Sequence, residues 1–122
     1  MITKSKMYFF NIAKKLSKKS DYKSYKLGSV IVKNNRIVGM GFNKDRTHPK
    51  SNSWDHYIHA ELSAILNAGE ECQGSDIYVY RENRIGEISP SKPCVNCKKL
   101  IVAAGIKNVY FTVKHGYEKE KV

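Results

Sequence analysis

The sequence predicts one α/β domain in which helices cover the faces of a mixed β-sheet. Segments with apolar residues at helical spacing alternate with short runs of β-branched residues, in the order helix, hairpin, helix, strand, helix, strand. The last two strands are joined through a helix, which is the connection that parallel strands require. A length of 122 residues suits a single domain, residues 1–122, with one modest core.

Each element is indicated by its own local pattern. Phe9, Ala13 and Leu16 mark the apolar side of the first helix, and lysines occupy the other side. Gly69 and Gly105 stand where the second and third helices would stop. The expected elements are a helix over 5–18, a hairpin of strands 27–32 and 36–42, a helix over 60–68, a strand over 77–80, a helix after Pro93 and a strand over 109–113.

Basic residues are concentrated in the first part of the chain. Residues 1–50 contain thirteen Lys or Arg and two Asp, whereas residues 51–122 contain nine residues of each sign. The excess behind the net charge of +11 therefore lies in the first segment. This distribution indicates an anionic partner, such as a nucleotide phosphate or a nucleic acid strand, and it is equally compatible with a solvated, lysine-rich surface.

The sequence argues against a membrane-spanning protein and against a disulfide framework. No stretch approaches the roughly 18 apolar residues that a membrane span needs, and residues 7–13 lack the cleavage site of a secretory signal. We therefore expect no membrane partner and a cytoplasmic location. Two of the three cysteines are separated by only two residues, which fits a metal half-site in a reducing compartment.

Two short segments, each at the expected start of a helix, carry the candidate chemistry. They are residues 59–61 (His-Ala-Glu) and residues 93–97 (Pro-Cys-Val-Asn-Cys). Zinc prefers nitrogen and thiolate ligands, and a catalytic zinc has three protein ligands and one position for water. His59, Cys94 and Cys97 match that set, and the positive end of a helix favours the thiolate form of cysteine.

Glu61 is the expected carrier of protons. Zinc lowers the pKa of water to near neutrality, which provides a nucleophile for a ring carbon that bears an amino group. Glu61 lies two residues beyond His59, where it could take a proton from water and deliver it to the ring nitrogen and the departing amine. The pattern H-x-E followed by P-C-x-x-C is the signature of zinc-dependent nucleobase deaminases, and the reaction is recognised from that signature.

A structural zinc would usually need a fourth protein ligand, for which His56 is the nearest candidate. We interpret His56 instead as a substrate-side or surface residue. Cys72, just after the second helix, is interpreted as an unpaired thiol.

The sequence resembles the cytidine and deoxycytidylate deaminase superfamily from about residue 26 to residue 112. Besides the two segments above, the resemblance rests on residues 27–32 (Leu-Gly-Ser-Val-Ile-Val), 41–43 (Gly-Phe-Asn) and 104–106 (Ala-Gly-Ile). It implies a three-layer α/β/α sandwich whose mixed sheet has an antiparallel N-terminal hairpin. The chain departs from the family in a longer loop over 81–92 and in the short segment after Val113, where the family's fifth strand and final helix can be missing.

The resemblance also implies substrate contacts. Asn43 would bind the nucleoside near its sugar or base, and the backbone at Ala60 would touch the polar edge of the ring. Apart from the resemblance, Trp54 lies on the aperiodic loop over 43–57, where its ring can stack on a base; packing against the protein is the alternative interpretation.

The favoured reaction is hydrolytic deamination of a cytosine-type base in a free deoxycytidylate-like nucleotide. The lysine excess also suits a deaminase of single-stranded DNA or RNA, and the compact length suits a tRNA adenosine deaminase. A non-catalytic, zinc-containing nucleic-acid-binding module is the alternative from another class, and Glu61 argues against it. The expected partner is a nucleotide or a single-stranded nucleic acid, with assembly into a homo-oligomer left open.

Overall fold

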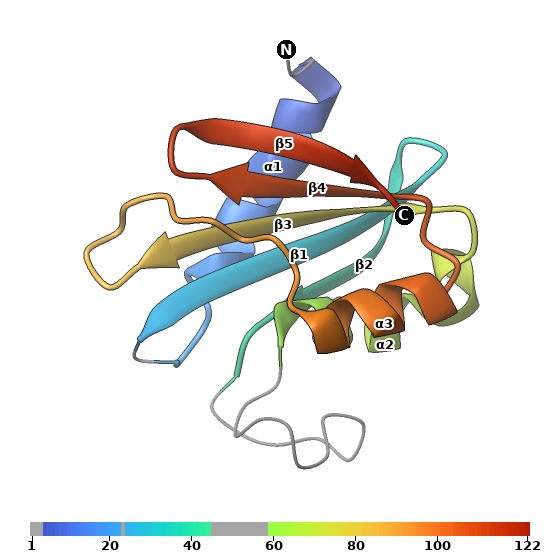
Figure 1. Ribbon diagram of the computed structural model, residues 1–122, viewed down its shortest axis with the longest axis horizontal. Helices are drawn as coiled ribbons and strands as arrows, with labels where there is room; N and C mark the ends of the chain where they lie inside the picture. The colour runs from blue at the N-terminus through green and yellow to red at the C-terminus, as the bar shows by residue number, and fades with distance from the viewer. Residues whose placement is uncertain (1–3, 23, 45–58) are drawn as a thin grey trace.

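The computed structural model describes residues 4–22, 24–44 and 59–122. The elements and their bounds are α1 (Lys4–Ser17), β1 (Tyr25–Lys33), β2 (Arg36–Phe42), α2 (Ala60–Ala68), the 3₁₀-helix η2 (Gly69–Cys72), β3 (Asp76–Asn83), α3 (Val95–Ala103), β4 (Asn108–Val113) and β5 (Gly116–Lys121) (Figure 1). The three helices and four of the strands correspond to those expected from the sequence.

The five strands form one mixed sheet in the order β2-β1-β3-β4-β5. β1 pairs antiparallel with β2 and with β3, while β3 and β4 are parallel and are joined through α3. The hairpin turns at Asn34 and Asn35, whose φ angles of 52° and 64° are those of a tight turn that asparagine tolerates. The antiparallel hairpin and the parallel pair are therefore confirmed.

The helices cover both faces of the sheet, which confirms the three-layer α/β/α arrangement (Figure 1). On one face, Phe9, Phe10 and Ala13 of α1 pack against strand residues that include Val30 and Tyr78. On the other face, α2 and α3 contribute a second core cluster with residues of the sheet; its helical members are Ala60, Ala64, Ala68 and Ile101. No helix within the described ranges is long and apolar enough to cross a membrane.

Glycines in the strands allow the helices to approach the sheet closely, as Gly28 and Gly41 illustrate. A Cβ atom at Gly28 would lie 1.9 Å from the carbonyl oxygen of Ala13, so α1 depends on this glycine for its position. A Cβ atom at Gly41 would lie 2.5 Å from the nitrogen of Ala64 and 2.7 Å from the oxygen of Ala60. Gly41 thus sets the height of the first turn of α2 above the sheet.

Two expectations about the second half of the chain are corrected. A fifth strand is present, because β5 pairs antiparallel with β4 from Gly116 to Lys121; no helix follows it within the described residues. Its sequence is mostly charged, as suits an exposed edge strand, and so it lacks the apolar signal of a buried one. The loop expected to begin at Arg81 begins after Asn83, because β3 continues to that residue, and it runs to the start of α3. Ser91 within it is anchored to the sheet through Val79 and Thr112.

Candidate metal centre

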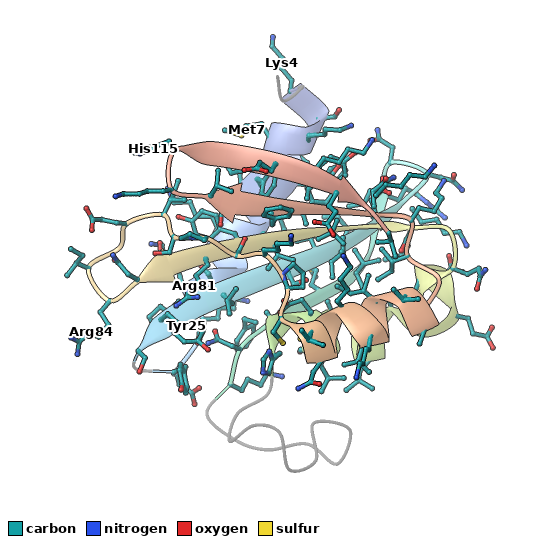
Figure 2. The ribbon with its side chains drawn as sticks, in the orientation of Figure 1. Lys4, Met7, Tyr25, Arg81, Arg84 and His115 are labelled. Atoms are coloured by element: carbon teal, nitrogen blue, oxygen red, sulfur yellow. The ribbon has the colours of Figure 1, made fainter. Side chains whose placement is uncertain are left out.

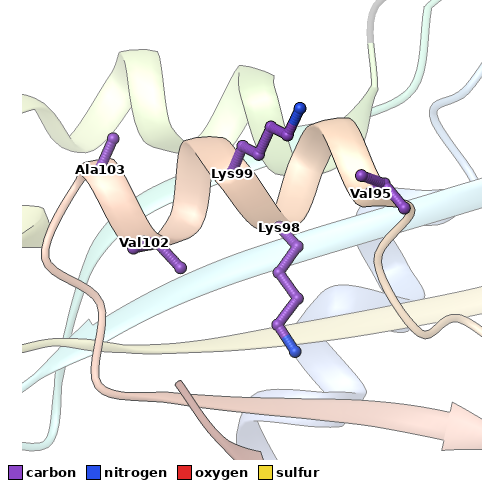
Figure 3. A pocket seen from close by; sticks show the side chains of 5 residues that line it. All are labelled: Val95, Lys98, Lys99, Val102 and Ala103. Carbon is purple, nitrogen blue, oxygen red and sulfur yellow. The ribbon is translucent and has the colours of Figure 1, made fainter.

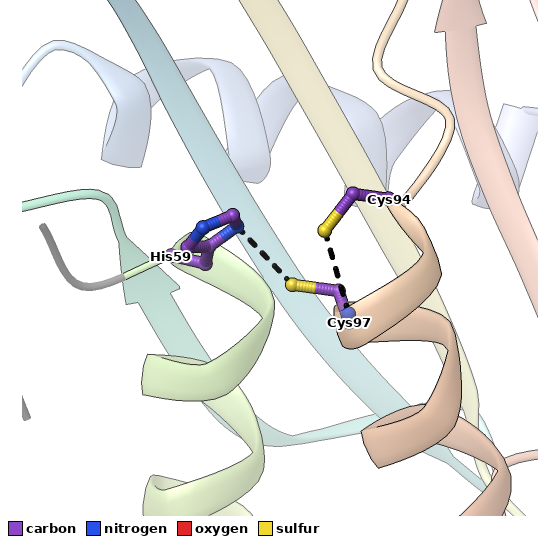
Figure 4. A group of neighbouring side chains, drawn as sticks. All are labelled: His59, Cys94 and Cys97. Carbon is purple, nitrogen blue, oxygen red and sulfur yellow. Dashed lines mark hydrogen bonds between the residues drawn. The ribbon is translucent and has the colours of Figure 1, made fainter. Parts of the chain in front are cut away.

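The three predicted metal ligands meet where α2 and α3 begin. His59 is the residue before α2 and Cys94 is the residue before α3, both with extended backbone, while Cys97 lies in the first turn of α3. The two helices lie side by side on the same face of the sheet, so their N-terminal ends bring the three side chains together (Figure 4).

The ligand atoms form a compact group. Sγ of Cys97 lies 3.2 Å from Nδ1 of His59, and the backbone N–H of Cys97 donates to Sγ of Cys94 at 3.4 Å. All three ligand atoms lie within 4.8 Å of one another. Tetrahedral zinc, with bonds of about 2.3 Å to sulfur and about 2.0 Å to nitrogen, places its ligand atoms about 3.6 Å apart. The imidazole and the two thiols therefore fit a zinc ion with little movement.

Burial and electrostatics distinguish the two cysteines. Cys97 is fully buried and His59 is almost so, whereas Cys94 is exposed. Hydrogen bonds from Cys97 and from His59 lower the pKa of the Cys94 thiol to about 4, although partial burial acts in the opposite direction. Cys94 is thus a thiolate at neutral pH, which is the form that binds zinc.

Glu61 lies in the first turn of α2, next to the ligands, and its side chain is 3% exposed. Its Oε1 atom has no hydrogen-bond partner within the described residues. Burial is the main cause that raises the pKa of this carboxyl to about 7, and the Cys94 charge adds to it, while a hydrogen bond to its own backbone and the His59 charge lower it. A carboxyl group that titrates near neutrality can both accept and donate a proton.

The structure describes two of the residues predicted to contact the substrate, Ala60 and Asn43. Ala60 is buried in the first turn of α2, beside the ligands. The side chain of Asn43 is bound to β1: its Oδ1 accepts from the N–H of Leu27 at 2.8 Å, and its Nδ2 donates to the oxygen of Tyr25 at 3.2 Å. Its contact with a substrate stays a prediction. Trp54 and His56 lie outside the described residues.

Sequence reasoning missed one feature on this face of the sheet. The guanidinium carbon of Arg81 lies 4.0 Å from the centre of the Tyr25 ring. Arg81 comes directly after the apolar run of β3, and the carboxyl ends of strands are where α/β sheets bind ligands. A basic residue at the end of this strand was therefore the sequence feature that could have indicated a ligand contact. Cys72 is buried and outside any disulfide, as expected.

A hollow of about 390 Å³ lies along α3 and is lined by residues of that helix (Figure 3). Val95 and Val102, exposed by 72% and 56%, line it together with Ala103 and two lysines. Cys97 points inward from the same helix. None of the three metal ligands lines the hollow.

Residues 3–113 match the family described as the cytidine and deoxycytidylate deaminase zinc-binding region. The chain belongs to this family. The match spans both ligand segments together with the sheet and helices that hold them, so the family's zinc-binding region corresponds to the cluster of His59, Cys94 and Cys97. The protein is thus a zinc-dependent deaminase of the cytidine deaminase superfamily.

The chain is also similar to individual deaminases. The chain is 36% identical over 119 residues to an uncharacterized deaminase in the luxG 3′ region of Aliivibrio fischeri, covering 90% of this chain and 74% of that protein. It is 31% identical over 126 residues to the deoxycytidylate deaminase of Mycobacterium phage D29, covering 85% and 91%. Three further relatives are longer, and the chain spans only 26% to 39% of their length.

A solved structure shows the same fold. The dCMP deaminase of the cyanophage S-TIM5 superposes with a TM-score of 0.67 at 24% identity, covering 89% of this chain and 82% of the cyanophage protein. At this level of identity the likeness establishes the α/β cytidine-deaminase-like architecture.

Proposed function

We propose that the protein deaminates a cytosine-type base hydrolytically and that its substrate is a free deoxycytidylate-like nucleotide. The observation that carries the proposal is the buried carboxyl group of Glu61, which has an oxygen without a hydrogen-bond partner among the described residues and stands beside a zinc ligand set. A buried polar atom normally has a partner, so an unpaired one beside a metal site indicates a place for a reacting molecule.

The chain's own residues would divide the reaction as follows. His59, Cys94 and Cys97 would hold zinc, and the bound metal would supply an acidified water as the nucleophile. The Glu61 carboxylate would take a proton from the attacking water and pass it to the ring nitrogen next to the reacting carbon. It would then take the remaining proton of the hydroxyl group added to that carbon and deliver it to the departing amine, which leaves as ammonia while the ring carbonyl forms. The walls around Glu61 exclude bulk water, which keeps its pKa near neutrality and allows both transfers.

The free nucleotide is favoured over a polynucleotide for two reasons. The relative from Mycobacterium phage D29, which this chain covers along most of its length, is a deoxycytidylate deaminase. The lysines of α1, among them Lys14 and Lys15, lie on the helix that covers the sheet face opposite α2 and α3. They are therefore poorly placed to guide a strand into the metal centre.

The test is release of ammonia by the zinc-loaded protein across a panel of substrates. The panel contains deoxycytidine, dCMP, CMP, adenosine and single-stranded oligonucleotides with cytosine, assayed with the wild type and with Glu61→Gln as the blank. We expect dCMP to be turned over and the blank to be silent. Deamination of oligonucleotides without turnover of dCMP, with a rate that falls steeply as salt rises, would favour a polynucleotide substrate instead.

A further inference from the structure

The stack of Arg81 on Tyr25 lies on the same face of the sheet as the metal centre. Tyr25 packs against the core cluster that contains the buried residues of α2 and α3. Arg81 is directly opposite Leu27 in the pairing of β1 with β3, and residues opposite each other in a sheet point to the same face. Leu27 belongs to that same cluster, so Arg81 also faces the helices that hold the ligands.

Arg81 also lies at the same end of the sheet as the metal centre. Its partner Leu27 is bonded on its other side to Asn43, the residue that follows β2. Two residues before Asn43, Gly41 touches the first turn of α2, which carries Glu61. The first turn of α2, which carries Glu61, therefore lies at the end of the sheet where β2 and β3 finish. Arg81 lies at this same end of the sheet.

The guanidinium group of Arg81 is held against a ring, but no carboxylate within the described residues pairs with its charge. Its guanidinium group lies 4.0 Å from the centre of the Tyr25 ring, and Figure 2 shows the two side chains next to each other. Its Nε atom is buried and has no hydrogen-bond partner within the described residues. None of the carboxylates there forms an ion pair with Arg81, since the adjacent Glu82 is paired with Lys18.

A buried guanidinium N–H without an acceptor is costly, and the planar fork of arginine suits the oxygens of a phosphate. The ring of Tyr25 holds that plane in place before any ligand arrives, which reduces the entropy lost on binding. We propose that Arg81 binds the phosphate of the substrate and so selects a nucleotide over the corresponding nucleoside. The proposal rests on the proposed function and specifies which residue would recognise the phosphorylated form.

The experiment compares Arg81→Gln with Arg84→Gln in the zinc-loaded full chain. Glutamine keeps a flat amide that can stay on Tyr25 but removes the charge, and Arg84 is an exposed residue three positions further that points away from the protein (Figure 2). For each variant, kcat/KM is measured with dCMP and with deoxycytidine. Binding of the products dUMP and deoxyuridine is measured by calorimetry.

We expect Arg81→Gln to lower kcat/KM for dCMP and the affinity for dUMP by about 10- to 100-fold, the range for a lost hydrogen bond to a charged group. Deoxycytidine and deoxyuridine should be unaffected, and Arg84→Gln should behave as the wild type. Equal effects on nucleotide and nucleoside, or no effect on either, would overturn the proposal. Arg81→Lys, which keeps the charge, provides the same comparison if the glutamine variant does not fold, and it should retain part of the preference for the phosphate.

The binding measurements with dUMP and deoxyuridine test the phosphate site independently of the deamination reaction. If the wild type releases no ammonia from any cytosine substrate, the deamination proposal fails on its own. A preference for dUMP over deoxyuridine that disappears in Arg81→Gln would still support the phosphate site. Equal affinity of the wild type for both compounds would refute it whether or not turnover is seen.

Discussion

Sγ of Cys97 lies 3.2 Å from Nδ1 of His59, although 38 positions of sequence separate the two residues. The contact exists because α2 and α3 begin at neighbouring points on one face of the sheet. It turns a P-C-x-x-C segment and an H-x-E segment into a single ligand set.

Removal of one ligand should abolish tight zinc binding. Cys97→Ala is expected to be purified without stoichiometric zinc and to melt at a lower temperature, because a metal that binds only the folded state stabilises it. Metal content is measured by mass spectrometry of the protein digest and melting by circular dichroism. Cys72→Ala, which removes a buried thiol outside the cluster, should keep its zinc. Stoichiometric zinc in Cys97→Ala would exclude this sulfur as a ligand.

Neutralising Glu61 should stop the chemistry and leave the metal in place. Glu61→Gln keeps the size of the side chain but removes the proton carrier, so kcat should fall by about 10²- to 10⁴-fold, the usual contribution of general acid–base catalysis. The zinc content should equal that of the wild type. Glu70→Gln, an exposed change just after α2, serves as the control. An unchanged kcat in Glu61→Gln would remove this carboxyl from the mechanism.

Gly28 and Gly41 should respond differently to an added methyl group. Gly28→Ala and Gly41→Ala should each lower the free energy of unfolding by about 1–3 kcal/mol or more, the usual cost of overpacking. Only Gly41→Ala should also weaken zinc binding, because its Cβ atom would push on the backbone of Ala60, next to His59. The Cβ atom added at Gly28 would instead contact α1, on the opposite face of the sheet. Zinc affinity is measured by competition with a chromogenic chelator, and equal losses in both variants would contradict this assignment.

The Asn43 side chain should stabilise the fold through its hydrogen bonds to β1, whether or not it also contacts the substrate. Asn43→Ala leaves the N–H of Leu27 and the oxygen of Tyr25 without their partner, which should cost about 1–3 kcal/mol for each buried group left unpaired. Urea unfolding measures the loss. Asn67→Ala is the matched control, because Asn67 also binds a strand N–H, that of Met40, but at an exposed site. A loss no larger than that of the control would show that Asn43 does not hold β1.

Alkaline pH should destabilise the fold through Tyr80. Burial, and then the nearby Glu82 carboxylate, raises the pKa of Tyr80 to about 12. A group with a raised pKa contributes stability that is complete below its unfolded value near 10 and is lost as the pH rises toward 12. Melting temperatures between pH 9 and 11.5 should therefore fall less steeply in Tyr80→Phe than in the wild type. Parallel curves would show that ionisation of Tyr80 is not coupled to unfolding.

Elements with a strong local pattern were predictable, and elements without one were not. α2 begins and ends where Ala60 and Gly69 indicated, because an apolar helical face and a glycine with positive φ are both local features. β5 was missed because an edge strand is stabilised by hydrogen bonds to β4 and needs no apolar run. The extension of β3 to Asn83 likewise depends on pairing with β1, which its polar residues do not reveal.

The residue types alone were enough to predict the three zinc ligands, because zinc needs particular donor atoms and these can be read directly from the amino-acid sequence. His59, Cys94 and Cys97 were named in this way and meet in the structure. Glu61 was named from the H-x-E signature, and its role as proton carrier stays a prediction. The tertiary structure alone decided what surrounds them, because burial and charge pairing depend on segments far apart in the chain. It placed Asn43 against β1, left an oxygen of Glu61 without a partner among the described residues, and set Arg81 on Tyr25 at the margin of the site.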